Sequence, residues 1–124
     1  MTPRLAKAKK LEAELRKHAL RLPETDEAFP WGERALRVKK KAFVFMRREK
    51  AELSFSVKLP QSRRQALALS FVAPTHYGLG KHGWVTVQVP TPTRALEAQF
   101  KEWIDESFRA VAPKRVLEAL AKGE

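Results

Sequence analysis

The chain of 124 residues contains no cysteine. This absence excludes disulfide bonds, thiolate zinc sites, iron–sulfur clusters and cysteine nucleophiles. Asparagine is also absent, and this scarcity of thermolabile residues, together with 31% charged residues, is typical of thermophile proteins. The longest apolar run, residues 66–73, is too short to cross a membrane. The basic N-terminus has no apolar stretch behind it, so we expect a cytoplasmic protein without a secretory signal.

Basic residues are in large excess, with 25 Lys and Arg against 14 Asp and Glu and a formal net charge of +11. Such an excess favours a polyanionic partner and carries no information about the fold. Most of it lies in residues 34–64, which hold eleven basic and two acidic residues. The length and an apolar content of 44% predict one domain over residues 1–124.

Hydrophobic periodicity separates helices from strands along the chain. Apolar residues at steps of three or four from Leu5 to Leu22 predict a helix that Pro23 ends. Two prolines and a glycine indicate a loop over residues 23–32. Later patterns predict strands over 36–38, 42–46, 53–59 and 84–89, a turn region over 74–83, and helices over 60–69, 93–111 and 113–120.

The predicted fold class is α+β, with an antiparallel sheet and helices packed on one of its faces. The strands follow one another too closely for crossover helices, so we expect tight hairpins at 39–41 and 47–52. Strand alternation predicts that the face away from the helices holds Arg37, Ser54, Ser56, Lys58, Trp84, Thr86 and Gln88.

The predicted hairpins place basic clusters at two turns, with Lys39–Lys41 at one tip and Arg47–Lys50 at the next. Projecting cations are suited to straddling a phosphate backbone. The alternative is that they keep the sheet edges soluble and prevent strand-to-strand aggregation. Because acidic residues are not interleaved with them, as they are on a solubilising surface, we favour nucleic acid as the partner.

Residues 78–83 match the pattern G-x-G-x-x-G. A strand is predicted after this run, whereas dinucleotide binding requires a helix there, so that function is excluded. Two interpretations remain. One is a tight turn whose glycines adopt positive φ; the other is a nest of backbone amides that contacts a phosphate together with Lys81.

Catalytic and metal sites find no support in the sequence. His76 and His82 lie six residues apart without a nearby carboxylate, which is a poor metal site. Asp105 and Glu106 lie on the polar side of a predicted helix, and no serine has a nucleophile motif. We therefore expect no enzyme activity, no catalytic residue, no metal and no cofactor.

Trp84 is predicted on the polar sheet face. It either stacks on a base or sugar or covers the sheet against a loop or a second subunit.

Four runs of sequence resemble one known family in the same order. They are 22–32 (LPETDEAFPWG), 36–43 (LRVKKKAF), 77–85 (YGLGKHGWV) and 107–115 (SFRAVAPKR). These runs resemble the conserved blocks of the MmcQ/YjbR-like family across nearly the whole chain. The resemblance implies a CyaY-like α+β fold in which the sheet and hairpin wings form a double-wing DNA-binding motif. The chain departs from the family's pattern at Lys39–Lys41, where a glycine is replaced, so we expect a lysine at positive φ.

We therefore expect a small DNA-binding protein, with DNA favoured over RNA, no membrane association, and a monomeric or weakly dimeric state. Recognition should depend on DNA shape, because Asn and Gln readers are few. The expected contact residues are Arg37, Lys39, Lys40, Lys41, Arg47, Arg48, Lys58, Arg63, Arg64, Lys81, His82 and Trp84. The alternatives are a protein-interaction module that uses the open sheet face, and a small-anion or nucleotide sensor at residues 78–83.

Overall fold

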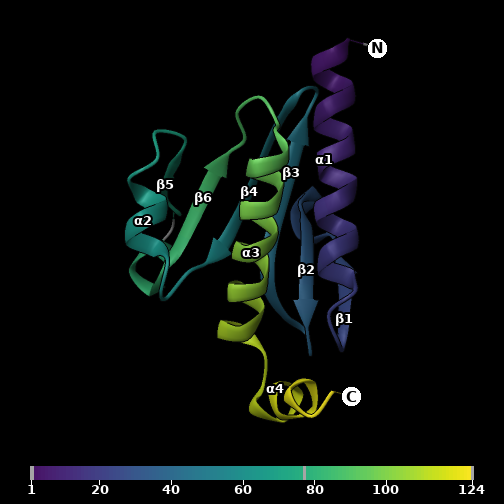
Figure 1. Cartoon of the computed structure of the whole chain (residues 1–124), viewed down its shortest axis with the longest axis vertical. Helices are drawn as coiled ribbons and strands as arrows, with labels where there is room; N and C mark the ends of the chain where they lie inside the picture. The colour runs from purple at the N-terminus through teal and green to yellow at the C-terminus, as the bar shows by residue number, and fades with distance from the viewer. Residues whose placement is uncertain (1, 77, 124) are drawn as a thin grey trace.

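Six antiparallel strands form one sheet in the order β1-β2-β3-β4-β6-β5 in the computed structural model of the chain, which describes residues 2–76 and 78–123 (Figure 1). Of Trp31 it describes the backbone alone, and Tyr77 of the third family-like run lies outside it. The strands are β1 (Thr25–Ala28), β2 (Arg34–Val38), β3 (Lys41–Glu49), β4 (Glu52–Lys58), β5 (Val72–Pro74) and β6 (Trp84–Gln88).

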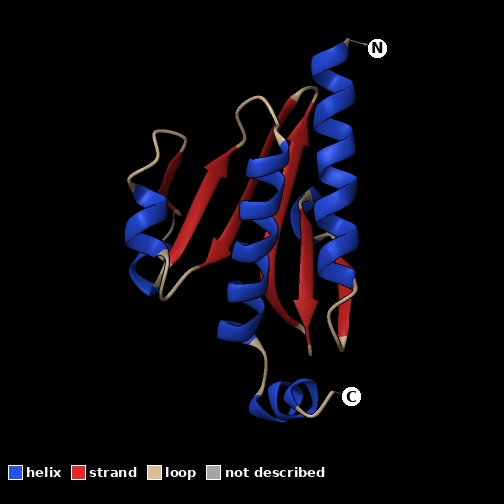
Figure 2. Ribbon diagram, in the orientation of Figure 1, coloured by secondary structure: helices blue, strands red, loops and turns tan. Residues whose placement is uncertain are grey.

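Two long helices, α1 (Pro3–Leu20) and α3 (Arg94–Val111), lie side by side over one face of the sheet (Figure 2). The short helix α2 (Arg63–Leu67) packs beside β5 and β6, and α4 (Lys114–Ala121) lies beyond one end of the sheet. Two 3-10 turns, η1 (Pro30–Gly32) and η2 (Leu79–His82), complete the fold. The predicted class, an α+β fold with helices on one side of an antiparallel sheet, is confirmed. Among the described residues, no helix is long and apolar enough to cross a membrane.

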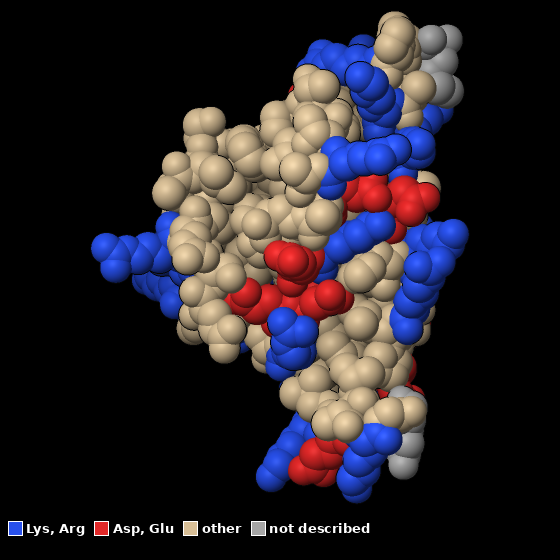
Figure 3. Space-filling view, viewed as in Figure 1, with Lys and Arg blue, Asp and Glu red and all other residues tan. Residues whose placement is uncertain are grey.

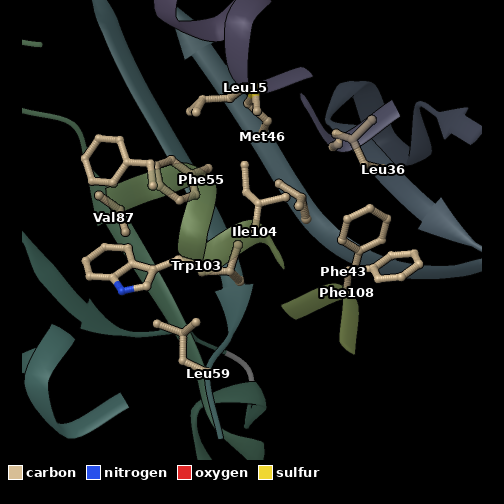
Figure 4. Close-up of a cluster of buried hydrophobic side chains, with 14 of the residues drawn as sticks. Leu15, Leu36, Phe43, Met46, Phe55, Leu59, Val87, Trp103, Ile104 and Phe108 are labelled. Atoms are coloured by element: carbon tan, nitrogen blue, oxygen red, sulfur yellow. The ribbon is translucent and has the colours of Figure 1, made fainter. Parts of the chain in front are cut away.

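The core lies between these two helices and the sheet (Figure 4). The register aligns Val44, Val57 and Val85 across β3, β4 and β6, and all three are fully buried. Aromatic rings from α3 meet rings from the strands edge to face, with centroid distances of 5.0 Å for Phe55–Phe100 and 5.4 Å for Phe43–Phe108. The period-two and period-3.6 apolar patterns therefore meet in a single core.

Strand β3 contains a bulge at Phe43. Leu36 pairs with Val44 but Arg37 pairs with Ala42, so Phe43 is an extra residue relative to β2. The β3–β4 ladder starts at Val44 and Val57, and the Phe43 carbonyl and the Lys58 amide lie just beyond it.

The buried Ser107 hydroxyl of α3 bridges these two groups. It accepts a hydrogen bond from the Lys58 amide at 2.8 Å and donates one to the Phe43 carbonyl at 2.6 Å. One side chain thus pairs two backbone groups that lie just beyond the end of the β3–β4 ladder.

Glu106, the preceding residue, anchors the segment that starts α2. One carboxylate oxygen accepts hydrogen bonds from the amides of Gln61 and Ser62, and the other accepts one from the Ser62 hydroxyl. Burial of Glu106 disfavours its charged form, but these hydrogen bonds outweigh burial and hold the pKa of Glu106 below its ordinary value.

The structure corrects several predicted boundaries. Strand β1 lies inside the predicted loop at 23–32, and β5 is a short strand that the apolar pattern did not indicate. Both are edge strands of three or four residues, too short to show alternation, and their pairing with β2 and β6 defines them. Helix α1 ends at Leu20 rather than Leu22, and β3 extends to Glu49.

Replacing Ser107 with alanine should lower the free energy of unfolding by about 2 to 4 kcal/mol, because two buried backbone groups lose their partner. Urea denaturation monitored by tryptophan fluorescence measures this change. Ser70→Ala removes the hydroxyl of an exposed serine and should change stability little. Equal effects of the two substitutions would contradict the bridging role.

Glu106→Gln should weaken the dependence of the free energy of unfolding on pH in the acidic range. A pKa below the ordinary 4.5 means that ionised Glu106 stabilises the fold above that pH, and that this contribution disappears as the pH falls through the folded-state pKa. The variant should therefore be less stable than the parent at pH 7 and converge with it toward pH 2. Thermal melts at several pH values measure this, and parallel curves for the two proteins would refute it.

Candidate nucleic-acid interface

The turn between β2 and β3 consists of two lysines in left-handed backbone conformation. Val38 pairs with Lys41, and the loop residues Lys39 and Lys40 have φ values of 48° and 70°. Positive φ at both central residues is the requirement of a type I′ hairpin, which usually carries Asn-Gly. The expected lysine at positive φ is confirmed, and Lys40 and Lys41 are both exposed.

Several cations gather at this same end of the sheet. The register places Lys41, Lys58 and Trp84 at the matching ends of β3, β4 and β6, next to the β2–β3 turn. The segment from Thr75 to Gly83 connects β5 to β6 at this end, and it carries Lys81. We call Lys40, Lys41, Lys58, Lys81 and Arg63 the basic end. Within the described residues, none of these five side chains has a carboxylate within 4.0 Å.

The second hairpin tip differs from the prediction. It lies at the opposite end of β3, about 30 Å away for nine strand residues. Arg47 and Arg48 belong to the strand and point to opposite faces, because β3 continues past the predicted turn. Arg48 pairs with Glu12 of α1 at 2.7 Å, and Arg4 pairs with Glu52. Among the described residues, Arg47 and Lys50 of the predicted cluster have no carboxylate within 4.0 Å.

Two more predicted contact residues are neutralised by ion pairs. Arg37 donates two hydrogen bonds of 2.8 Å to Asp26 on β1, and these hold the pKa of Asp26 below its ordinary value. Lys39 lies 3.1 Å from Glu24. The predicted loop at 23–32 contains instead an acidic strand that pairs beside Arg37, which the local pattern of prolines and glycine does not reveal.

Trp84 lies on the predicted face but is buried, with 7% of its surface exposed. Its ring packs against Phe45 at a centroid distance of 5.6 Å. The prediction that Trp84 stacks on a base requires an exposed ring, so the structure favours the alternative in which it covers the sheet. Phe45 is half-buried on the same face. It belongs to an unbroken apolar run, in which alternation cannot indicate the residues that face away from the core.

A groove of about 530 Å³ opens on the sheet face away from the helices. Its floor comes from β3, β4 and β6, and the segment before β6 forms one side. The lining residues include Phe45, Arg47, Ser54, Ser56, Thr86, Thr75, His76, Leu79 and Glu33. A chain of hydroxyl hydrogen bonds crosses it, with distances of 2.8 Å for Ser56–Thr86 and 3.0 Å for Thr75–Thr86. We call it the open-face groove.

The glycine-rich run forms a tight turn beside this groove. Gly78 and Gly83 flank η2 with φ values of 81° and 89°, so the predicted positive-φ turn is confirmed. A second hollow at this turn is lined by Arg63, Lys81, His76, Thr75, Pro74, Gly78 and Gly80. We call it the glycine-turn hollow. His82 and Arg64 are exposed but do not line it.

The helix side of the molecule has a different charge. Acidic side chains gather at its centre, over α3 (Figure 3). Glu102, Asp105 and Glu106 line a shallow hollow there. A polyanion is repelled from this region over α3, although basic side chains lie over α1 on the same side (Figure 3). The opposite sheet face and the basic end are the candidate interface.

These features define an α+β protein whose open sheet face lies between two hairpin wings that share one strand. The chain belongs to the YjbR family, whose sequence model matches residues 20–110. A solved structure of a protein from Pseudomonas syringae, a structural genomics target, is 17% identical to the chain with a TM-score of 0.57. The match covers 77% of this chain and 93% of that one, and it supports the fold. No curated protein matches the chain.

Replacing Lys40 with glycine should raise the free energy of unfolding by about 1 kcal/mol, because glycine adopts a φ of 70° without the steric cost paid by lysine. Lys40→Ser removes the same charge but keeps a side chain at positive φ, so it should not stabilise. Thermal melts of both variants measure the difference. Equal stability of the glycine and serine variants would contradict the assignment of strain to this turn.

Proposed function

We propose that the protein binds DNA through its basic end and open sheet face, as a binding protein rather than an enzyme. The observation that carries the proposal is the separation of charge. The cations of the basic end lack carboxylate partners in the described structure, whereas the helix side is acidic over α3. A surface built for solubility alone would interleave the two signs.

The geometry supports contacts with phosphates more than contacts with base edges. Lys40 and Lys41 lie at a projecting turn, and lysines contribute mainly point charges that neutralise phosphates. The open face presents hydroxyls from Ser54, Ser56 and Thr86, and it has one long amide side chain, Gln88. Few bidentate readers are available, so recognition rests on the shape and spacing of the backbone.

DNA, in preference to RNA, follows from the family resemblance, which implies a double-wing DNA-binding motif. Ion pairs within the protein change which basic residues can contact phosphates. Arg37, Lys39 and Arg48 are already paired with carboxylates, so the proposed phosphate contacts fall to Lys40, Lys41, Lys58, Lys81, Arg63 and Arg64. Arg47 lines the open-face groove and contributes a further positive charge there.

Replacing Lys40 and Lys41 with glutamine should weaken duplex binding and flatten its salt dependence. Two lost phosphate contacts reduce the slope of log K against log salt by about 2. Fluorescence anisotropy of a labelled random duplex at several salt concentrations measures the slope.

The matched control replaces Lys9 and Lys10, two exposed lysines of α1, with glutamine and makes the same change in net charge. The control should retain most of the parent's slope. If both double variants change the slope equally, binding depends on net charge and the assignment to the basic end is wrong. If the parent does not bind the duplex at low salt, the proposed function is wrong.

A further inference from the structure

The open-face groove and the glycine-turn hollow adjoin each other. Thr75 and His76 line both, so the two hollows meet at these residues. The groove lies over Phe45 and the hydroxyl chain, and the hollow lies beside Arg63 and Lys81. Together they form one depression with an aromatic, hydroxyl-lined part and a cationic part.

The two ends of this depression differ in the charge of their lining residues. Glu33 and Arg47 both line the groove, and the β2–β3 register extended by one residue places them opposite each other. That part of the groove therefore carries charges of both signs. The hollow at the other end is lined by Arg63 and Lys81, and none of its described lining residues is acidic. An anionic group is favoured at the hollow and disfavoured beside Glu33.

Arg63 provides a second observation at the hollow. Its Nε is buried and has no hydrogen-bond partner in the described structure. A buried donor without a partner is costly, so the guanidinium that lines the hollow is incompletely satisfied by the protein.

The segment that forms one side of the depression is held in place by the backbone. The Thr75 amide donates to the Trp84 carbonyl at 3.1 Å, and the Gly80 amide donates to the Thr75 carbonyl at 3.1 Å. A Cβ at Gly80 would lie 3.0 Å from the Pro74 Cβ and the Thr75 carbonyl oxygen, so close packing requires glycine there. The depression is therefore formed before any ligand arrives, which lowers the entropy cost of binding.

We propose that this depression binds one nucleoside 5′-phosphate unit, with the base over Phe45 and the phosphate at Arg63 and Lys81. Aromatic rings stack on bases of any sequence, and hydroxyls provide donors and acceptors for the sugar. The groove volume of about 530 Å³ lies within the usual range for small-ligand sites. The unit is either a free nucleotide or one nucleotide of a single strand. Only the second form rests on the proposed function.

The test titrates the full chain with AMP, adenosine, inorganic phosphate, a twelve-nucleotide deoxyadenosine strand and a duplex containing that strand, by calorimetry and anisotropy. Phe45→Leu keeps the apolar volume but removes the aromatic face. The matched control, Phe29→Leu, alters an aromatic residue that is 59% exposed and lies outside the depression. Thermal melts establish that both variants fold.

Phe45→Leu should weaken binding of AMP or of the single strand at least about fivefold and affect duplex binding, which rests on phosphate contacts at the basic end, much less. Lys81→Gln should weaken binding of AMP and of the single strand. Phe29→Leu should weaken neither. Binding of AMP alone assigns the site to free nucleotides, and binding of the strand without AMP assigns it to a nucleotide within a chain.

The inference is overturned if neither AMP nor the single strand responds to Phe45→Leu, or if inorganic phosphate binds as tightly as AMP. Duplex binding that still depends on Lys40 and Lys41 would then leave the proposed function standing. Conversely, AMP binding that depends on Phe45 without any duplex binding would refute the proposed function and support a free-nucleotide site.

Discussion

The Ser107 hydroxyl holds together the part of the molecule on which the rest depends. By pairing with the Phe43 carbonyl and the Lys58 amide, it fixes α3 to two strands at the point where their ladder ends. The bulge directs both Phe43 and Val44 into the core, and Phe43 packs against Phe108, the residue that follows Ser107. The backbone of Lys58, a residue of the basic end, is held by this same hydroxyl. The position of the basic end therefore depends on a buried, hydrogen-bonded serine rather than on surface contacts.

Ion pairing divides the cations of this protein into two groups. Acidic residues of α1 and β1 form ion pairs with four arginines, and each pair joins two different elements. The arginines are Arg16, Arg34, Arg37 and Arg48. The hydrogen bond from Arg16 is the largest influence on the pKa of Glu27; together with that from Arg34 it outweighs burial and holds this pKa below its ordinary value. Within the described residues the lysines of the basic end have no such partners, whereas Lys39 of the β2–β3 turn pairs with Glu24. Structural charge is thus mostly arginine, and the charge available to a ligand is mostly lysine.

Periodicity was sufficient to predict the fold class, because long helices and half-buried strands repeat their apolar residues often enough to reveal a face. It failed at β1 and β5, whose existence depends on neighbours that are distant in sequence. The same limit affects the site. Lys39–Lys41 was placed correctly at a turn because that turn is local, whereas the ion pair of Arg37 and the burial of Trp84 depend on tertiary contacts. Phe45 was hidden in an unbroken apolar run, since alternation cannot be read where both faces are apolar.

The two hairpin tips are the two ends of one strand, β3, and this makes β3 a molecular ruler. Each residue of a strand adds about 3.3 Å, and each reverses the face that the following side chains occupy. The separation of the tips can therefore change only in steps of two residues, about 7 Å, if Phe45 and Arg47 are to stay on the open face. Members of the fold with longer or shorter wings on this strand would span a correspondingly different length of any extended ligand, while their cores retained the same pairing.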